Sequence, residues 1–155
     1  MRIRREHRRG IAVVEMAFGL PIFLLFVFAL IWFGHLQLVN NMLQAACRNA
    51  ARVGAIEGTT TADIVAHVQS VLAPVVETGE VDIIVKDAGA YDASDVLPQT
   101  AEEFADLPDV EVGDMESRDM FLVRATVNYR SVALIPIMPF SKDVVLVGQT
   151  FARHE

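Results

Sequence analysis

Residues 16–34 read MAFGLPIFLLFVFALIWFG, nineteen consecutive residues without a charged side chain. Coiled as an α-helix with a rise of about 1.5 Å per residue, this run is roughly 28 Å long, close to the thickness of the hydrocarbon core of a bilayer. Core helices of soluble domains usually keep one polar face, whereas this run is apolar on every side. The sequence therefore predicts one transmembrane helix near the N-terminus.

The charges on the two sides of the apolar run differ strongly. Residues 1–10 carry five Arg and one Glu, whereas residues 53–155 carry 6 basic and 18 acidic residues. Because basic segments stay in the cytoplasm, we expect a cytoplasmic N-terminus, a single pass through the cytoplasmic (inner) membrane and an exported C-terminal domain. An acidic domain repels phosphate backbones, so nucleic acid is not an expected partner.

A removable secretory signal also consists of a basic segment followed by an apolar run. Here the run is longer than such a signal needs, and no small-x-small cleavage site follows it directly. A lipoprotein site at Cys47 would lie more than ten residues beyond the run. We therefore expect the helix to stay in the protein and Cys47 to be a small packing residue.

Two residues of the N-terminal stretch are unusual in a plain anchor. Glu15 places a carboxylate four residues into the apolar stretch, where an unpaired charge is costly. The carboxylate can reach towards the headgroups, pair with Arg8 or Arg9, or pair with another subunit. Pro21 removes one backbone donor and clashes with the preceding turn, which predicts a kink in the helix.

The segment RRGIAVVEMAFGLPIFLLFVFAL resembles the N-terminus of a type IV prepilin, and most closely that of the TadE-like pseudopilins. The shared pattern is Arg-Arg-Gly, four apolar residues, Glu and a following Pro. The alanine-rich continuation AACRNAARVGA, and Arg153 and Glu155 near the C-terminus, also fit the TadE-like pattern. The resemblance implies that residues 1–10 are a basic leader, which a prepilin peptidase removes by cutting between Gly10 and Ile11.

The resemblance also implies a function. The chain would be a minor pilin or pseudopilin that takes part in assembling a Tad-type (type IVc) surface pilus for adherence or secretion. Its partners would be the prepilin peptidase, other pilin or pseudopilin subunits, the Tad assembly machinery and membrane lipid, and it could be incorporated in the pilus.

A physical argument supports a processing boundary before Ile11. Cleavage would create an α-amino group, and this group could pair with Glu15 of a neighbouring subunit in low-dielectric surroundings. Such a pair would set the axial register of packed helices, as a single buried polar residue does in coiled coils. Glu15 is therefore the predicted assembly residue. The alternative function is a single-pass anchored domain that binds another envelope component without entering a filament.

The helix is expected to continue beyond the membrane. Residues 11–38 form the predicted transmembrane helix and residues 39–58 its continuation, ended by Gly54 or Gly58. The predicted packing stripe, at helical spacing, consists of Leu38, Met42, Ala45, Ala46, Asn49 and Val53. The small alanines on this stripe permit close packing on the sheet of the same chain or on another subunit.

Residues 59–155 are predicted to form a small exported α+β domain, in which a second helix packs on a short antiparallel sheet. Thr61 is the expected N-cap of that helix, and Pro74 should end it. The predicted strands are residues 81–86, 121–132 and 144–151. The last two strands are expected to pair across the loop IPIMPFSK at 135–142, and the middle strand to bury one face. Between the first two strands, the acidic stretch 87–119 is expected to be irregular, as a solvated loop or a partner surface.

Nothing in the sequence points to catalysis, and we expect no enzyme activity, no cofactor and no metal site. The histidines, namely His7, His35, His67 and His154, lack metal-ligand spacing. The acidic stretch lacks the spaced oxygen ligands of an EF-hand, and no phosphate-binding loop or nucleophile elbow is present.

Overall fold

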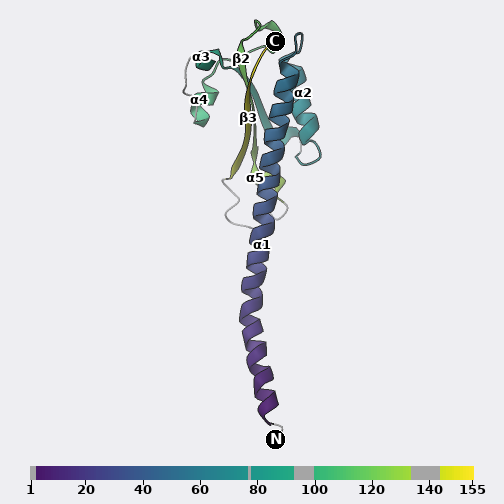
Figure 1. Cartoon of the computed structure of the whole chain (residues 1–155), viewed down its shortest axis with the longest axis vertical. Helices are drawn as coiled ribbons and strands as arrows, with labels where there is room; N and C mark the ends of the chain where they lie inside the picture. Colours follow the sequence, from purple (N-terminus) through teal and green to yellow (C-terminus); the bar gives the residue numbers. More distant parts are fainter. Residues whose placement is uncertain (1–2, 77, 93–99, 134–143) are drawn as a thin grey trace.

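The computed structural model describes residues 3–76, 78–92, 100–133 and 144–155. One long helix carries a small domain at its C-terminal end, and the N-terminus lies at the far end of the rod (Figure 1). The elements follow in the order α1 (Ile3–Gly54), α2 (Thr61–Leu72), η1 (Thr78–Glu80), β1 (Val81–Asp87), α3 (Gly89–Asp92), α4 (Ala101–Ala105), η2 (Val112–Asp114), β2 (Met120–Asn128), α5 (Tyr129–Val132) and β3 (Val145–Arg153). The predicted α+β fold with a long N-terminal helix is confirmed.

Helix α1 is one continuous helix of 52 residues. It begins at Ile3, eight residues before the expected start at Ile11, because Arg and Glu in the leader are good helix formers and Gly10 costs only about 1 kcal/mol. The helix runs through Pro21 without interruption, and the kink at that residue stays a prediction. It ends at Gly54, the first of the two predicted ends.

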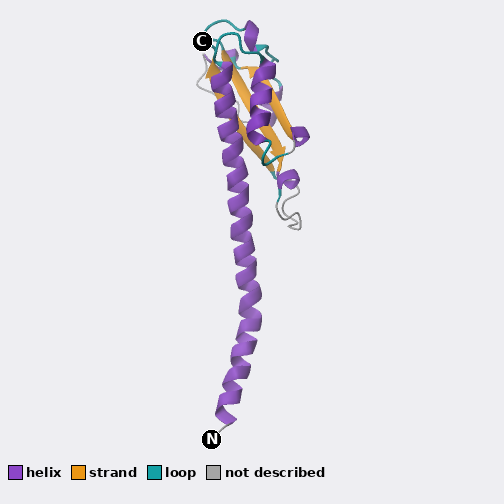
Figure 2. Ribbon diagram, turned by 90° about the vertical axis from the view of Figure 1, so that its right-hand side faces the viewer, coloured by secondary structure: helices purple, strands orange, loops and turns teal. Residues whose placement is uncertain are grey.

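The domain has three layers around an antiparallel sheet of strand order β1-β2-β3. Figure 2 shows α1 and α2 side by side on one face of the sheet. On the other face, Phe104 and Leu107 pack with Ala88 and Leu122 in a second, smaller core. The sheet therefore buries both faces, and β2 is its central strand.

The face that α1 presents to the sheet lies one residue away from the predicted stripe. Of the predicted positions, Leu38 is 55% exposed, and Ala45 and Asn49 are also exposed. The buried residues of this face are Val39, Leu43, Ala46, Cys47, Ala50 and Ala51. Helical spacing fits both stripes equally well, since each is apolar or small at every turn. The sheet selects the stripe that can approach it most closely.

Cys47 is a packing residue, as predicted. Its side chain is fully buried between α1 and the sheet, and its Sγ donates a hydrogen bond to the carbonyl oxygen of Gly148 at 3.3 Å. Burial raises the pKa of the thiol to about 11. The thiol therefore stays protonated at neutral pH and has no nucleophilic role.

Helix α2 begins one residue earlier than predicted. Thr60 is the N-cap and forms a capping box with Asp63. The hydroxyl of Thr61 instead donates to the carbonyl oxygen of Val110 and accepts from the backbone N–H of Val112, each at 3.0 Å. Thr61 thus joins the start of α2 to the segment before β2. The helix ends at Leu72, two residues before Pro74.

The strand predictions are confirmed in part. Strands β1 and β3 lie within two residues of their predicted bounds, and β2 pairs antiparallel with both. The predicted middle strand is four residues too long, because the side chain of Asn128 accepts a hydrogen bond from the backbone N–H of Arg130 and starts α5. The predicted loop 135–142 lies outside the described residues.

The acidic stretch 87–119 is exposed over most of its described residues, as predicted, but it contains short helices and is not wholly irregular. Thr100 and Glu103 form a capping box that starts α4, and this turn places Phe104 on the second core. The acidic composition of this segment gave no indication that two of its apolar side chains, Phe104 and Leu107, pack on the sheet. The expected single buried face of β2 is wrong for the same reason, since Leu122 is fully buried beneath Phe104.

Helix α1 and strand β3 approach each other closely at Gly148. A Cβ atom added at Gly148 would stand 2.5 Å from the carbonyl carbon of Leu43 and 2.6 Å from its oxygen. Real Cβ atoms do not approach backbone this closely, so any larger residue would push the helix away from the sheet. Gly148 is therefore required for the helix to lie on β3.

We expect Gly148→Ala to lower the free energy of unfolding by about 1–3 kcal/mol, the usual cost of overpacking a close contact. Thermal unfolding of the detergent-solubilised chain measures this loss. Gly79→Ala is the control, because no atom lies within 4 Å of the Cβ position there. Equal stability of the Gly148 variant and the wild type would contradict the close contact.

Candidate assembly site

The N-terminal half of α1 is an uncovered apolar surface. Residues 12–31 are exposed apart from the half-buried Val27, and Phe18 and Ile22 are 73% and 69% exposed. By length and composition, α1 is apolar enough to cross a membrane, and its most apolar window is not buried by the rest of the described chain. Twenty residues at about 1.5 Å each give roughly 30 Å of helix, which matches a hydrocarbon core. This helix fits a single-pass anchor.

An aromatic contact marks the point where the domain begins to cover α1. The rings of Trp32 and Tyr129 meet edge to face with centroids 6.0 Å apart. Nδ1 of His35 lies 3.2 Å from the phenolic oxygen of Tyr129. We call Trp32, His35 and Tyr129 the aromatic collar. The uncovered length ends at this collar, so it is shorter than the predicted transmembrane stretch 11–38.

Tryptophan favours the headgroup level of a bilayer, and the half-buried Trp32 lies at the end of the exposed stretch 12–31. Tyr129, in contrast, is buried within the domain. Burial raises the pKa of the Tyr129 phenol, which therefore keeps its proton and can donate to His35 when Nδ1 is unprotonated. Nothing in the sequence pointed to Tyr129 as a partner of Trp32 and His35.

Glu15 lies near the opposite end of the uncovered surface. It is seventeen residues before Trp32, which corresponds to about 26 Å along the helix axis. With Trp32 at one interface, Glu15 is a few ångströms inside the other one. Its side chain is exposed and forms no hydrogen bond or ion pair with the described part of the chain.

Gly10 and Ile11, the predicted processing residues, lie within the first turns of α1. Ile11 and Glu15 are four residues apart, so they share one face of the helix. The structure brings these residues together on successive turns, and no described residue from the domain lies near them (Figure 1). The side chains of residues 3–11 lie outside the description, so the pairing of Glu15 with Arg8 or Arg9 stays a prediction.

The described residues contain no group of three or more His, Cys, Asp or Glu side chains that could hold a metal ion. The candidate site is therefore a surface, built from one helix and bounded by Glu15 and the aromatic collar. Such a surface can be solvated by lipid chains or by the helices of other subunits.

Comparison with known proteins gives a match to the same segment of α1. The model of a family described as TadE-like protein matches residues 10–52. The match begins at Gly10, includes Glu15 and Pro21, and ends two residues before α1 does. The resemblance to the TadE-like family is thus confirmed for this stretch. No curated protein and no solved structure matches the chain.

The chain has one tryptophan, so its fluorescence reports a single depth in a membrane. In vesicles with brominated lipids, we expect bromines near the headgroups to quench Trp32 more strongly than bromines near the chain ends. The double variant Trp32→Phe with Phe23→Trp should show the reverse order, because residue 23 lies about 14 Å further along the helix, near mid-bilayer. Stronger quenching of Trp32 by the deep bromines would refute the assignment of the boundary.

Proposed function

We propose that this chain is a minor pilin-like subunit, a pseudopilin, of a Tad-type pilus system. In this proposal a prepilin peptidase cuts between Gly10 and Ile11 on the cytoplasmic side of the inner membrane. The domain lies on the exported side, and α1 later leaves the lipid to pack against helices of other subunits. The chain then serves pilus assembly, and through it adherence or secretion.

One observation carries this proposal. The TadE-like match covers the whole uncovered part of α1, including Glu15, together with the following residues up to 52 that pack on the domain. Residues 12–31 of the matched segment are exposed apart from the half-buried Val27, and an exposed apolar surface is suited to contacts with other molecules.

The cost of an unpaired Glu15 carboxylate in lipid gives assembly a driving force. A carboxylate facing lipid without a partner is unfavourable even at shallow depth, and the cost falls where a cation replaces lipid. Cleavage before Ile11 supplies such a cation as the new α-amino group. Within one helix this amine lies about 6 Å from Glu15 along the axis, whereas a neighbouring helix can be placed level with it.

The second candidate is a single-pass anchored domain that binds an envelope component and stays in the membrane. It accounts for the apolar span and for the aromatic collar. It leaves Glu15 without a purpose and gives no reason for a Gly-Ile boundary between basic and apolar residues. No feature of the described structure favours it over the pseudopilin.

We expect the mature chain to start at Ile11 when a prepilin peptidase is co-expressed and at Met1 when it is absent. N-terminal sequencing of the membrane fraction distinguishes the two. Gly10→Leu should abolish the shortened form, because a side chain at the cut position obstructs a site that accepts glycine. An unprocessed chain in the presence of active peptidase would support the anchored domain instead.

We expect Glu15→Gln to leave α1 in the membrane but to reduce incorporation into sheared pili at least tenfold, equivalent to about 1.4 kcal/mol. Immunoblotting of pili and membranes, with processing followed in the same samples, measures this effect. Glu57→Gln, at an exposed residue just after α1, is the matched control. Normal incorporation of the Glu15 variant into pili would contradict an assembly role for Glu15.

A further inference from the structure

Strand β3 is an edge strand, because the sheet order is β1-β2-β3. One row of its backbone N–H and C=O groups therefore has no partner strand among the described residues. Two hollows open along this edge, one of about 260 Å³ beside Val147 and Gln149, and one of about 330 Å³ beside residues 150–153. We call these two hollows together the β3 groove.

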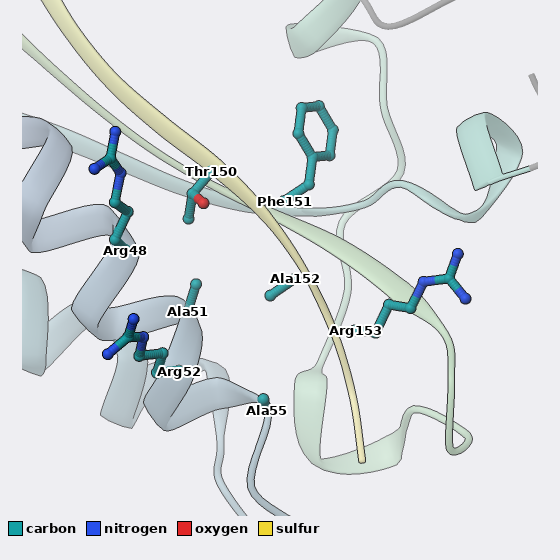
Figure 3. A pocket seen from close by; sticks show the side chains of 8 residues that line it. All are labelled: Arg48, Ala51, Arg52, Ala55, Thr150, Phe151, Ala152 and Arg153. Carbon is teal, nitrogen blue, oxygen red and sulfur yellow. The ribbon is translucent and has the colours of Figure 1, made fainter. Parts of the chain in front are cut away.

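The residues that line the β3 groove lie on both faces of the sheet at the edge formed by β3. Helix α1, which covers one face of the sheet, contributes Gln44, Arg48, Ala51 and Arg52 to the two hollows, and Ala55 follows directly after the helix. The opposite face contributes Phe104 and Arg124 to the first hollow. In Figure 3, Arg48 and Arg52 stand on the helix side of β3, and Arg153 points to the other side. An occupant of the groove would thus meet arginines on both of its faces.

The charge of the groove is opposite to that of the domain. Residues 53–155 contain 18 acidic and 6 basic side chains, yet neither hollow is lined by Asp or Glu. Arg48 and Arg52 are exposed and form no ion pair with the described residues. A basic edge on an acidic domain favours an acidic occupant.

Arg124 adds an independent observation. Its side chain is only 9% exposed, and its guanidinium stacks on Phe104 with 4.3 Å between Cζ and the ring centroid. Its Nη1 is buried and has no hydrogen-bond partner among the described residues. A buried guanidinium with an unused donor is costly, and a carboxylate or carbonyl oxygen arriving in the first hollow would remove that cost.

We propose that the β3 groove binds an extended acidic segment of a partner protein, which adds as a fourth strand to the edge of β3. Backbone hydrogen bonds supply affinity, as in other cases of strand addition. Successive side chains of a strand point to opposite faces. Acidic side chains of the partner therefore reach Arg48 and Arg52 on one face and Arg124 on the other.

A partner protein fits better than a second copy of this chain. The described acidic segment before β2 is already held by its own fold. Asp109 pairs with Lys86 at 2.8 Å, Glu111 accepts a hydrogen bond from the backbone of Thr61, and Phe104 is buried. Releasing this segment to another copy would expose the second core. The proposal does not depend on Glu15 or on processing.

The test uses the full chain in detergent micelles and a fluorescein-labelled heptapeptide of Glu, Asp and Val, with binding followed by anisotropy. We expect this peptide to bind at least tenfold more tightly than its Gln and Asn counterpart. N-methylation of alternate backbone amides should abolish binding. The double variant Arg48→Gln with Arg52→Gln changes only exposed residues, and should weaken binding of the acidic peptide at least tenfold.

Arg130→Gln is the matched control, because Arg130 is exposed on α5, outside the groove, and it should bind the peptide as the wild type does. Arg124→Gln, checked by circular dichroism, should also weaken binding. Equal affinities for the acidic and neutral peptides, no binding of the acidic peptide, or undiminished binding by the double variant would overturn the proposal. Sedimentation showing a dimer that the double variant abolishes would assign the groove to a second copy instead.

Discussion

The contact of α1 with β3 at Gly148 is the constraint on which the rest of the structure depends. The absence of a side chain there lets the backbone at Leu43 lie almost directly on the strand, and the thiol of Cys47 bonds to the carbonyl of Gly148 from one turn further along. Small residues at Ala46 and Ala50 continue this close approach. One end of a very long helix is thereby held firmly to a small sheet.

Because the domain packs only on the C-terminal half of α1, the other half projects without covering from the rest of the described residues (Figure 1). The aromatic collar closes the domain at the point where the uncovered helix begins. The same arrangement leaves the free edge of β3 open beside α1. The molecule thus has two surfaces that its own fold does not satisfy, one apolar along residues 12–31 and one basic at the β3 groove.

Much of this architecture could be predicted from the sequence. Nineteen uncharged residues predict a span, Thr61 and Pro74 bound the predicted second helix to within two residues, and β-branched residues mark the strands. Predictions failed where the local sequence fitted two arrangements equally well. The stripes through Leu38 and through Val39 are both apolar, so periodicity could not choose between them. The burial of Phe104 was missed because the overall composition of the acidic stretch does not show that one of its residues packs in a core.

By itself, the sequence determined the long apolar helix, the position of Glu15 in it and the change from basic to apolar residues after Gly10, since these depend on spacing along one chain. Only the tertiary structure decided which face of α1 meets the sheet, that Tyr129 completes the aromatic collar, and that Arg124 reaches the edge of β3 with an unused donor. Those features join residues from 25 positions apart, as Arg124 and Gln149 are, to 105, as Leu43 and Gly148 are. Their contacts arise from how closely backbones can approach, a quantity that local patterns do not contain.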